Sequence, residues 1–182
     1  MHIRKASVRD AKAIAKVHVD TWRTAYEGII PTSFLENLSY QTRMESWEMT
    51  LNKVDNYVLV AVDDDSKVIG FADTSTRPTN LETNSTDLTS LYLLQEYQGR
   101  GIGKLLMQEL FRYYNEQNYD SVYVEVLKDN PTKTFYEAFG AKHIEDIEIK
   151  IGEKLLIESI YKWDLKSMGN INFKGDHLCL NT

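Results

Sequence analysis

The sequence has little of what disulfide-bonded, membrane-inserted or secreted proteins require. Its one cysteine, Cys179, excludes an intramolecular disulfide, and in a polar C-terminal stretch it offers neither a metal cluster nor a nucleophile held in a core. No stretch approaches the ~20 apolar residues that a membrane-spanning helix needs. The N-terminus turns polar at once and shows no apolar signal-peptide segment. We therefore expect a cytoplasmic protein without a membrane partner.

Basic charge is also scarce. The chain has 21 Lys and Arg against 27 Asp and Glu, a formal net charge of -6. A sequence-independent nucleic-acid binder needs a basic face to neutralise phosphates, so this balance argues against nucleic acid as a partner and favours a cationic or neutral substrate. The histidines lack metal-ligand spacing, so we expect no bound metal and assign no ligand among His2, His18, His143 and His177.

The composition is that of a folded globular protein. Hydrophobic residues make up 42% of the 182 residues and aromatic residues 11%, which suffices for one core. The last segment, from Lys166 to Thr182, has no sustained periodicity. We therefore predict a single domain over residues 1–165 and a C-terminal tail over 166–182.

Helical patterns dominate the first fifty residues. Ser7, with Asp10 three residues later, resembles a capping box and predicts a helix that runs to about Tyr26. Further helical turns are expected over residues 34–51, with Ser39 as an N-cap.

Strand patterns begin at Tyr57. The segment 77–87, rich in Thr, Asn and Ser, is typical of an exposed loop. Apolar spacing predicts a helix over 102–118. A second, short helix is expected between an N-cap at Asn130 and a C-terminal exit at Gly140. The expected strands cover residues 57–62, 67–76, 88–94, 121–127, 143–151 and 154–164, and residues 2–5 form a short start of alternating apolar and polar residues.

A glycine-rich loop, Gln98-Gly99-Arg100-Gly101-Ile102-Gly103, connects a strand to the next helix. Glycine tolerates positive φ, so several backbone N–H groups can turn toward one phosphate at the positive end of the helix dipole. Arg100 and Lys104 add positive charge nearby. Neither the dinucleotide-binding pattern nor the mononucleotide loop is present. From the residues alone, a tight strand-to-helix connection without a ligand stays open.

Two segments resemble the acetyl-CoA signatures of the GNAT N-acetyltransferase superfamily. Leu91 to Gly103 reads LYLLQEYQGRGIG, and Asn130 to Ala141 reads NPTKTFYEAFGA. The resemblance covers about residues 2–164 and is sharpest between 88 and 141. It implies a mixed α/β (α+β) fold whose central, twisted, mostly antiparallel sheet has about seven strands and a splayed parallel pair, flanked by about four helices. Gln95 stands where many members have proline, which should alter loop stiffness more than ligand contacts.

The resemblance also implies where acetyl-CoA binds. Backbone amides of the glycine-rich loop would hold the pyrophosphate, and the preceding strand would pair with the pantetheine arm like an added strand. The Asn130 side chain would bind the same arm. The residues implied to contact acetyl-CoA, and coenzyme A as product, are Leu91, Tyr92, Leu93, Gln98, Gly99, Arg100, Gly101, Ile102, Gly103, Lys104, Asn130 and Tyr136.

Acetyl transfer to an amine needs a base, an amide donor and an acid. Tyr136 matches the family position that often protonates the leaving thiolate; from the residues alone, an aromatic core position stays open. Glu125 lies mid-strand among valines, at a position from which some members use a glutamate as base, directly or through water. A carboxylate that only attracts a cation is the alternative. The backbone amide of Leu93 is implied to polarise the carbonyl.

The acceptor site is expected at the end of the first helix, where Trp22, Tyr26 and Glu27 would contact an amine through cation–π and ionic interactions. A core position for Trp22 is the alternative. The sequence thus predicts an acetyl-CoA-dependent N-acetyltransferase that acts on a primary amine, a small molecule rather than a protein, in a direct ternary complex. A non-catalytic acyl-CoA sensor, a protein N-terminal or lysine acetyltransferase, and a homodimer stay open.

Overall fold

The fold is built around one seven-stranded sheet with helices on both faces. A computed structural model describes residues 1–54, 56–77, 80 and 82–168. Cys179, His177 and most of the expected tail lie outside these residues. The strands are β1 (His2–Lys5), β2 (Tyr57–Val62), β3 (Val68–Ser75), β4 (Ser85–Leu93), β5 (Ser121–Leu127), β6 (Lys142–Ile151) and β7 (Lys154–Asp164), and their order in the sheet is β1-β2-β3-β4-β5-β7-β6.

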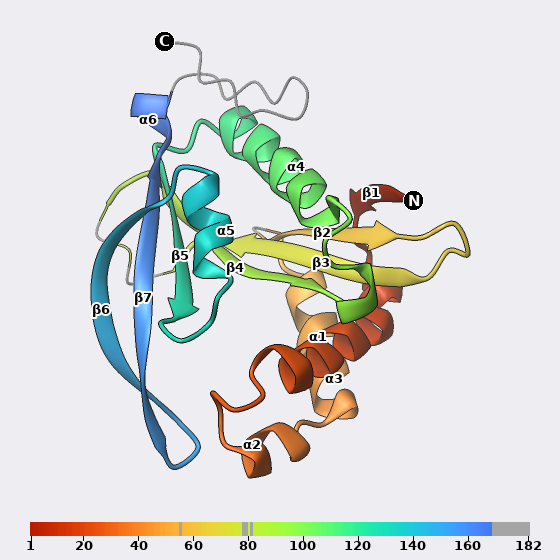
Figure 1. Cartoon of the computed structure of the whole chain (residues 1–182). Helices are drawn as coiled ribbons and strands as arrows, with labels where there is room; N and C mark the ends of the chain where they lie inside the picture. Colours follow the sequence, from red (N-terminus) through yellow and green to blue (C-terminus); the bar gives the residue numbers. More distant parts are fainter. Residues whose placement is uncertain (55, 78–79, 81, 169–182) are drawn as a thin grey trace.

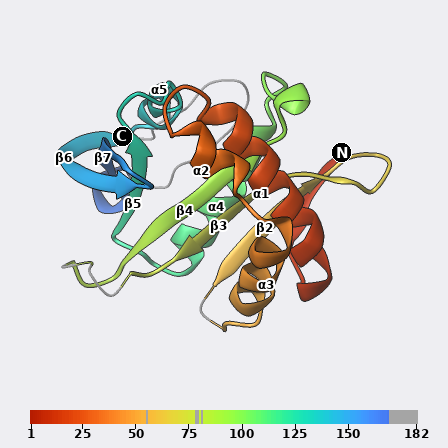
Figure 2. The same ribbon diagram turned by 90° about the horizontal axis from the view of Figure 1, so that it is seen from below.

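Every neighbouring pair of strands is antiparallel except β4 and β5, which run parallel. This confirms the expected sheet with its single parallel pair. The helices are α1 (Ala11–Ala25), α2 (Thr32–Glu36), α3 (Tyr40–Leu51), α4 (Ile102–Glu116), α5 (Lys133–Ala138) and α6 (Leu165–Met168), with 3-10 turns at Val8–Asp10 and Gln95–Tyr97. Helix α4 covers one face of the sheet, and α1, α2 and α3 cover the other (Figures 1 and 2).

The helix boundaries follow local capping chemistry. Ser7 and Asp10 form the expected capping box at the entry to the first helical segment. The Ser39 hydroxyl accepts a hydrogen bond from the backbone N–H of Thr42 at 3.2 Å, which confirms Ser39 as the N-cap of α3.

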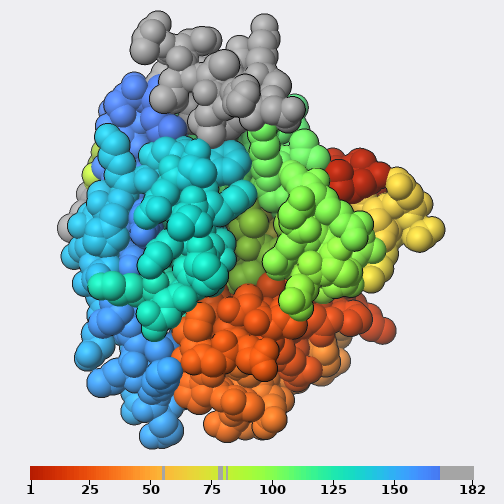
Figure 3. Space-filling model, in the orientation of Figure 1, coloured from red at the N-terminus to blue at the C-terminus, as the bar shows by residue number. Residues whose placement is uncertain are grey.

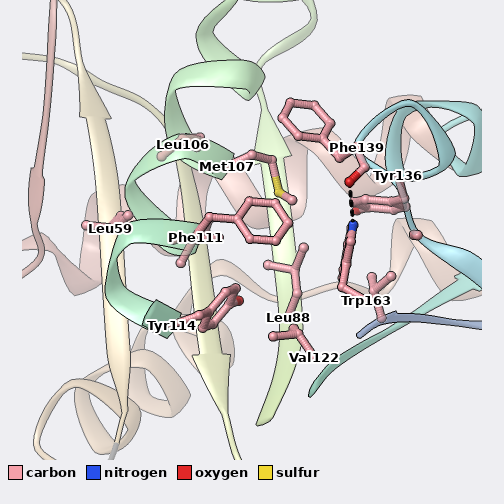
Figure 4. Close-up of a cluster of buried hydrophobic side chains, with 14 of the residues drawn as sticks. Leu59, Leu88, Leu106, Met107, Phe111, Tyr114, Val122, Tyr136, Phe139 and Trp163 are labelled. Carbon is pink, nitrogen blue, oxygen red and sulfur yellow. Dashed lines mark hydrogen bonds between the residues drawn. The ribbon is translucent and has the colours of Figure 1, made fainter. Parts of the chain in front are cut away.

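The largest core lies between the sheet and helices α4 and α5 (Figure 4). Phe111 of α4 packs edge-on against Trp163 of β7, with ring centroids 5.6 Å apart. The Trp163 indole N–H donates to the carbonyl of Phe139 at 2.9 Å, so the one polar atom of this buried ring is paired. This packing fixes α5 against β7 and sets one wall of the site described below.

Two segments differ from the sequence expectation. Residues 85–87 belong to β4 and are buried, whereas an exposed loop was expected up to Asp87. The parallel pairing of Ser85 with Ser121 starts the strand early, and polar partners cover the Asp87 carboxylate. At the other end of the chain, Leu165–Met168 form the short helix α6, and Leu165 is buried.

No helix among the described residues is both long and apolar enough to cross a bilayer. Likewise, no cluster of three or more His, Cys, Asp or Glu side chains within the described part of the chain is arranged to hold a metal ion.

Candidate active site

The site is a cleft created by the separation of β4 and β5. Their backbone pairing runs from Ser85 with Ser121 to Leu88 with Val124 and then stops. Beyond this point the strands diverge and leave a cavity of about 460 Å³, whose mouth is hollowed between α4 and α5 in Figure 3. It is lined by Thr21, Ala25, Tyr26, Leu88, Thr89, Ser90, Leu91, Tyr92, Leu93, Gln98, Gly99, Gly101, Ile102, Gly103, Lys104, Val124, Glu125, Val126, Asn130, Pro131, Thr132, Phe135 and Tyr136.

The free edge of β4 presents backbone groups to this cavity. The N–H of Leu94 donates to the carbonyl of Ile69 in β3 at 3.0 Å, so Leu94 and Ile69 form a hydrogen-bonded pair of the ladder. Pairs alternate in an antiparallel ladder, so Leu93 and Leu91 direct their N–H and C=O groups away from β3 and into the cleft. The Leu93 carbonyl accepts from the side chains of Thr21 (3.4 Å) and Gln98 (3.1 Å).

The glycine-rich loop closes one end of the cavity at the N-terminus of α4. Gly99 and Gly101 adopt φ values of 71° and 78°, the left-handed region that side chains with a Cβ rarely enter. Gly103 packs against Phe135, whose ring lies 3.4 Å from the position a Cβ would take. Because α4 has fifteen residues, its dipole favours an anion at this loop.

The loop's charged residues are placed differently. Lys104 lines the cavity. The Arg100 guanidinium instead lies over the Tyr97 ring, 5.2 Å from its centroid, and stands outside the cavity lining. Of the two cations expected beside a phosphate, Lys104 therefore sits at the cavity in this conformation.

Asn130 anchors the opposite wall. Its side-chain oxygen accepts from the backbone N–H (2.9 Å) and the hydroxyl (2.7 Å) of Thr132, which fixes the turn into α5. Burial raises the pKa of the Tyr26 phenol, and interactions with the side chains of Tyr92 and Asn130 offset part of this rise. Asn130 is thus a buried amide in the wall of the cavity.

Three tyrosines gather at the centre of the cavity. The hydroxyls of Tyr26 and Tyr92 lie 3.4 Å apart, and Tyr136 lines the same cavity from α5. Burial raises the pKa of Tyr136 well above its usual value, and the nearby Tyr26 adds to the rise. The Tyr136 hydroxyl is consequently protonated at neutral pH and can donate a proton or a hydrogen bond.

Glu125 reaches the cavity from β5 on the face that carries α1 and α2. It forms an ion pair with Arg77 and interacts with Glu158 of β7, whose pKa is raised to about 7 by burial and by the Glu125 charge. Glu158 itself is not among the lining residues, so its charge acts on the cavity through Glu125.

The structure separates the three residues expected at the acceptor site. Tyr26 lines the cavity. Trp22 packs edge-on against Tyr26, with centroids 5.0 Å apart, and supports it from behind the lining. Glu27 is exposed and does not belong to the lining residues.

Sequence reasoning missed Arg77, Asp87, Glu158 and Asp73. Arg77 and Asp87 belong to the segment 77–87, which was expected to be an exposed loop. Glu158 belongs to the strand expected over 154–164, which was recognised from its apolar residues alone. Asp73 is a buried acid in β3 with 6% of its surface exposed. For the three acids the available signal was a carboxylate within a strand beside one apolar residue, which is weaker than the Val124-Glu125-Val126 pattern that drew attention to Glu125.

Comparisons with known proteins agree with this geometry. The model of the Acetyltransferase (GNAT) family matches residues 17–141. An uncharacterised N-acetyltransferase, YuaI, of Bacillus subtilis is 33% identical over 167 residues, which are 91% of this chain and 95% of that protein.

Two further similarities come from Thermoplasma acidophilum. Its spermidine N(1)-acetyltransferase is 26% identical over 169 residues, 89% of this chain and 98% of that protein. The crystal structure of its PaiA N-acetyltransferase in complex with coenzyme A matches with a TM-score of 0.66 and 24% identity, covering 86% of this chain and 96% of that one. The chain therefore belongs to the GNAT acetyltransferase family and is an acyltransferase.

Proposed function

We propose that this enzyme transfers the acetyl group of acetyl-CoA directly to the primary amine of a small molecule. The observation that carries the proposal is one continuous cavity. It joins the glycine-rich loop at α4 to Tyr136 and Glu125 through the gap between β4 and β5. Both substrates can therefore meet inside the sheet without a covalent intermediate on the protein.

The residues present fit acetyl-CoA. The left-handed backbone at Gly99 and Gly101 and the N-terminus of α4 suit the pyrophosphate, and the free backbone groups of Leu91 and Leu93 suit the amide-bearing arm. When bound, acetyl-CoA supplies the thioester that carries the acetyl group. Asn130 holds the wall beside the arm, and Arg100 lies over the Tyr97 ring, outside the cavity lining.

Proton transfer is assigned to two side chains. Glu125, coupled to Glu158, accepts the proton that the amine loses when it attacks. Tyr136, whose hydroxyl stays protonated at neutral pH, donates a proton to the leaving thiolate. The backbone N–H of Leu93 faces the cleft and polarises the carbonyl that is attacked.

A small acceptor is supported by two observations. The spermidine acetyltransferase of Thermoplasma acidophilum resembles this chain over nearly its whole length. In addition, the α1–α2 segment packs against the β6–β7 hairpin. The Lys154 ammonium donates to the carbonyl of Ile29 at 2.8 Å, and Phe34 lies against Gly152. This packing closes one side of the acceptor region and leaves less room for an extended polypeptide.

A coenzyme A release assay across small amines, amino sugars and peptide N-termini tests the proposal. Small amines should release thiol in proportion to the acetylated product, and Tyr136→Phe and Glu125→Gln should each lower kcat. Release of thiol only with peptides would contradict the small-molecule assignment. Binding of coenzyme A without turnover of any amine would indicate a sensor instead of an enzyme.

A further inference from the structure

Four carboxylates from four strands lie on the sheet face that carries α1 and α2. Glu125 of β5 and Asp87 of β4 both contact the guanidinium of Arg77, and Glu158 of β7 interacts with Glu125. Asp73 of β3 pairs with Ser90 of β4, and Ser75, two residues further along β3, pairs with Asp87. We call these four acids and Arg77 the carboxylate groove.

The groove carries more negative than positive charge. The guanidinium of Arg77 interacts with three of the four acids: its Nε lies 3.5 Å from Asp87, its terminal nitrogen pairs with Glu125, and its charge acts on Glu158. The nearest lysine on β7, Lys162, is held by Glu82 at 2.5 Å and is already neutralised. Buried carboxylates without a matching cation are costly, so this arrangement is complete only when another cation arrives.

Asp73 shows most directly that a partner is missing. Its carboxyl group is buried, and one of its oxygens, Oδ1, has no hydrogen-bond partner among the described residues. The hydroxyl side chains of Thr89 and Ser90 interact with the same carboxyl group, and both residues line the cavity. Asp73 therefore stands directly behind the cavity wall.

A bulge in β4 opens the wall at this point. The register shifts between Asp73 and Thr74, which pair with Ser90 and Leu88 and leave Thr89 without an opposite residue in β3. The Thr89 hydroxyl lies 3.2 Å from that of Ser75, on the face of the carboxylate groove. The small hydroxyl side chains of Thr89 and Ser90 thus separate Asp73 from the cavity. At this bulge the regular pairing of β3 with β4 is interrupted.

We infer that the acceptor is an aliphatic diamine or polyamine, whose first amine reacts beside Glu125 while a second, protonated amine binds at the Thr89–Ser90 wall, in front of the Asp73 carboxylate. This inference rests on the proposed acetyl transfer. An ammonium group offers three hydrogen-bond donors and no acceptor, so it can donate to the hydroxyl oxygens of this wall and is attracted by the buried carboxylate behind them. Tyr92 and Tyr26 border the same space and suit the alkyl chain between two amines.

The ionisation of the groove agrees with this assignment. Burial raises the pKa of Asp73 to about 7 and also raises that of Asp87. Burial and the charge of Glu125 raise the pKa of Glu158 to about 7. A bound dication would stabilise the ionised forms of these acids. A metal ion is a poorer match, because no three acids of the described chain converge as ligands.

The test compares 1,4-diaminobutane with 1-aminobutane, which share a reacting amine and a chain length. The diamine should have a kcat/KM about 30-fold or more above the monoamine, the effect of one charged hydrogen bond. Calorimetry in the presence of coenzyme A should show the same preference in binding. This second readout does not depend on turnover.

Variants localise the preference. Asp73→Asn should lower the ratio of the two kcat/KM values about tenfold, whereas Asp65→Asn, in an exposed turn, should leave the ratio unchanged. Equal kcat/KM and equal binding of the two amines by the native enzyme would overturn the inference and leave acetyl transfer intact. Failure of every amine to release coenzyme A would instead contradict the proposed function. The native ratio decides the question even if Asp73→Asn does not fold.

Discussion

Leu88 and Val124 are the last residues paired across the parallel strands β4 and β5, and the cavity opens where this pairing ends. Past it, β4 keeps its bonds to β3 on one edge and turns free backbone groups toward β5 on the other. Tyr136, Asn130 and Glu125 then converge on the gap from α5, the turn before it and β5. The fold thus converts an incomplete strand pairing into a two-sided substrate cavity.

The loop conformation predicts a selective effect of Gly101→Ala. At φ 78° a Cβ costs roughly 1–2 kcal/mol of backbone strain, although nothing lies within 4 Å of it. We expect the dissociation constant for coenzyme A to rise about tenfold. The matched control is Gly152→Ala in the β6–β7 turn, which is also at positive φ and is not among the residues that line the cavity. Equal coenzyme A affinities for the two variants by calorimetry would argue against a phosphate role for the loop.

Removal of the Tyr136 hydroxyl should affect chemistry more than binding. Tyr136→Phe keeps the buried ring and deletes the acid, so kcat should fall about 10²- to 10⁴-fold, while KM for acetyl-CoA changes little. Tyr114→Phe is the control, because Tyr114 is buried under α4 outside the cavity lining. A full kcat in Tyr136→Phe would show that the leaving thiolate is protonated by another group.

The pKa of Glu158, raised to about 7, predicts a pH dependence of catalysis. Glu125, Arg77 and Tyr26 are the titratable groups that interact with Glu158. Ionised Glu158 adds negative charge beside Glu125 and so favours proton transfer to Glu125, which means that kcat/KM should rise as the pH passes upward through about 7. Glu158→Gln should remove this step, and Glu153→Gln in the β6–β7 turn should retain it. Identical profiles for Glu158→Gln and the native enzyme would exclude Glu158 from the proton path.

Asp10 should contribute to stability in a pH-dependent way. Hydrogen bonds from the Arg4 guanidinium at 2.7 and 2.9 Å lower the pKa of Asp10 from 3.8 to about 2. The stabilisation is present above the unfolded pKa near 4 and is lost as the pH falls toward 2. Asp10→Asn should therefore cost about 1–2 kcal/mol at neutral pH in urea unfolding. If Asp10→Asn destabilised the protein no more than Asp65→Asn, the ion pair would be energetically unimportant.

The sequence was informative about the cofactor half of the site because that half is local. Gly99, Gly101 and Asn130 act within a few residues of the helices they precede, so their chemistry follows from short motifs. The same holds for the Ser7 and Ser39 caps.

The acceptor half is non-local and could not be predicted in the same way. Asp73, Asp87 and Glu158 share one face of the sheet only because β3, β4 and β7 have particular registers with their neighbours. Residues 85–87 were mistaken for a loop because Thr, Asn and Ser are typical of exposed segments. Their burial depends on pairing with β5, more than thirty residues further along the chain. Strand register is decided by contacts that no local pattern contains.

The most direct test of acetyl transfer at this cavity is a product analysis. The native enzyme is incubated with isotope-labelled acetyl-CoA and 1,4-diaminobutane, and labelled N-acetyl product and free coenzyme A are measured by mass spectrometry beside Tyr136→Phe and Gly101→Ala. We predict equal amounts of the two products from the native enzyme and strongly reduced formation by both variants. Coenzyme A release without any N-acetylated amine, across diamines and other small primary amines alike, would contradict the account.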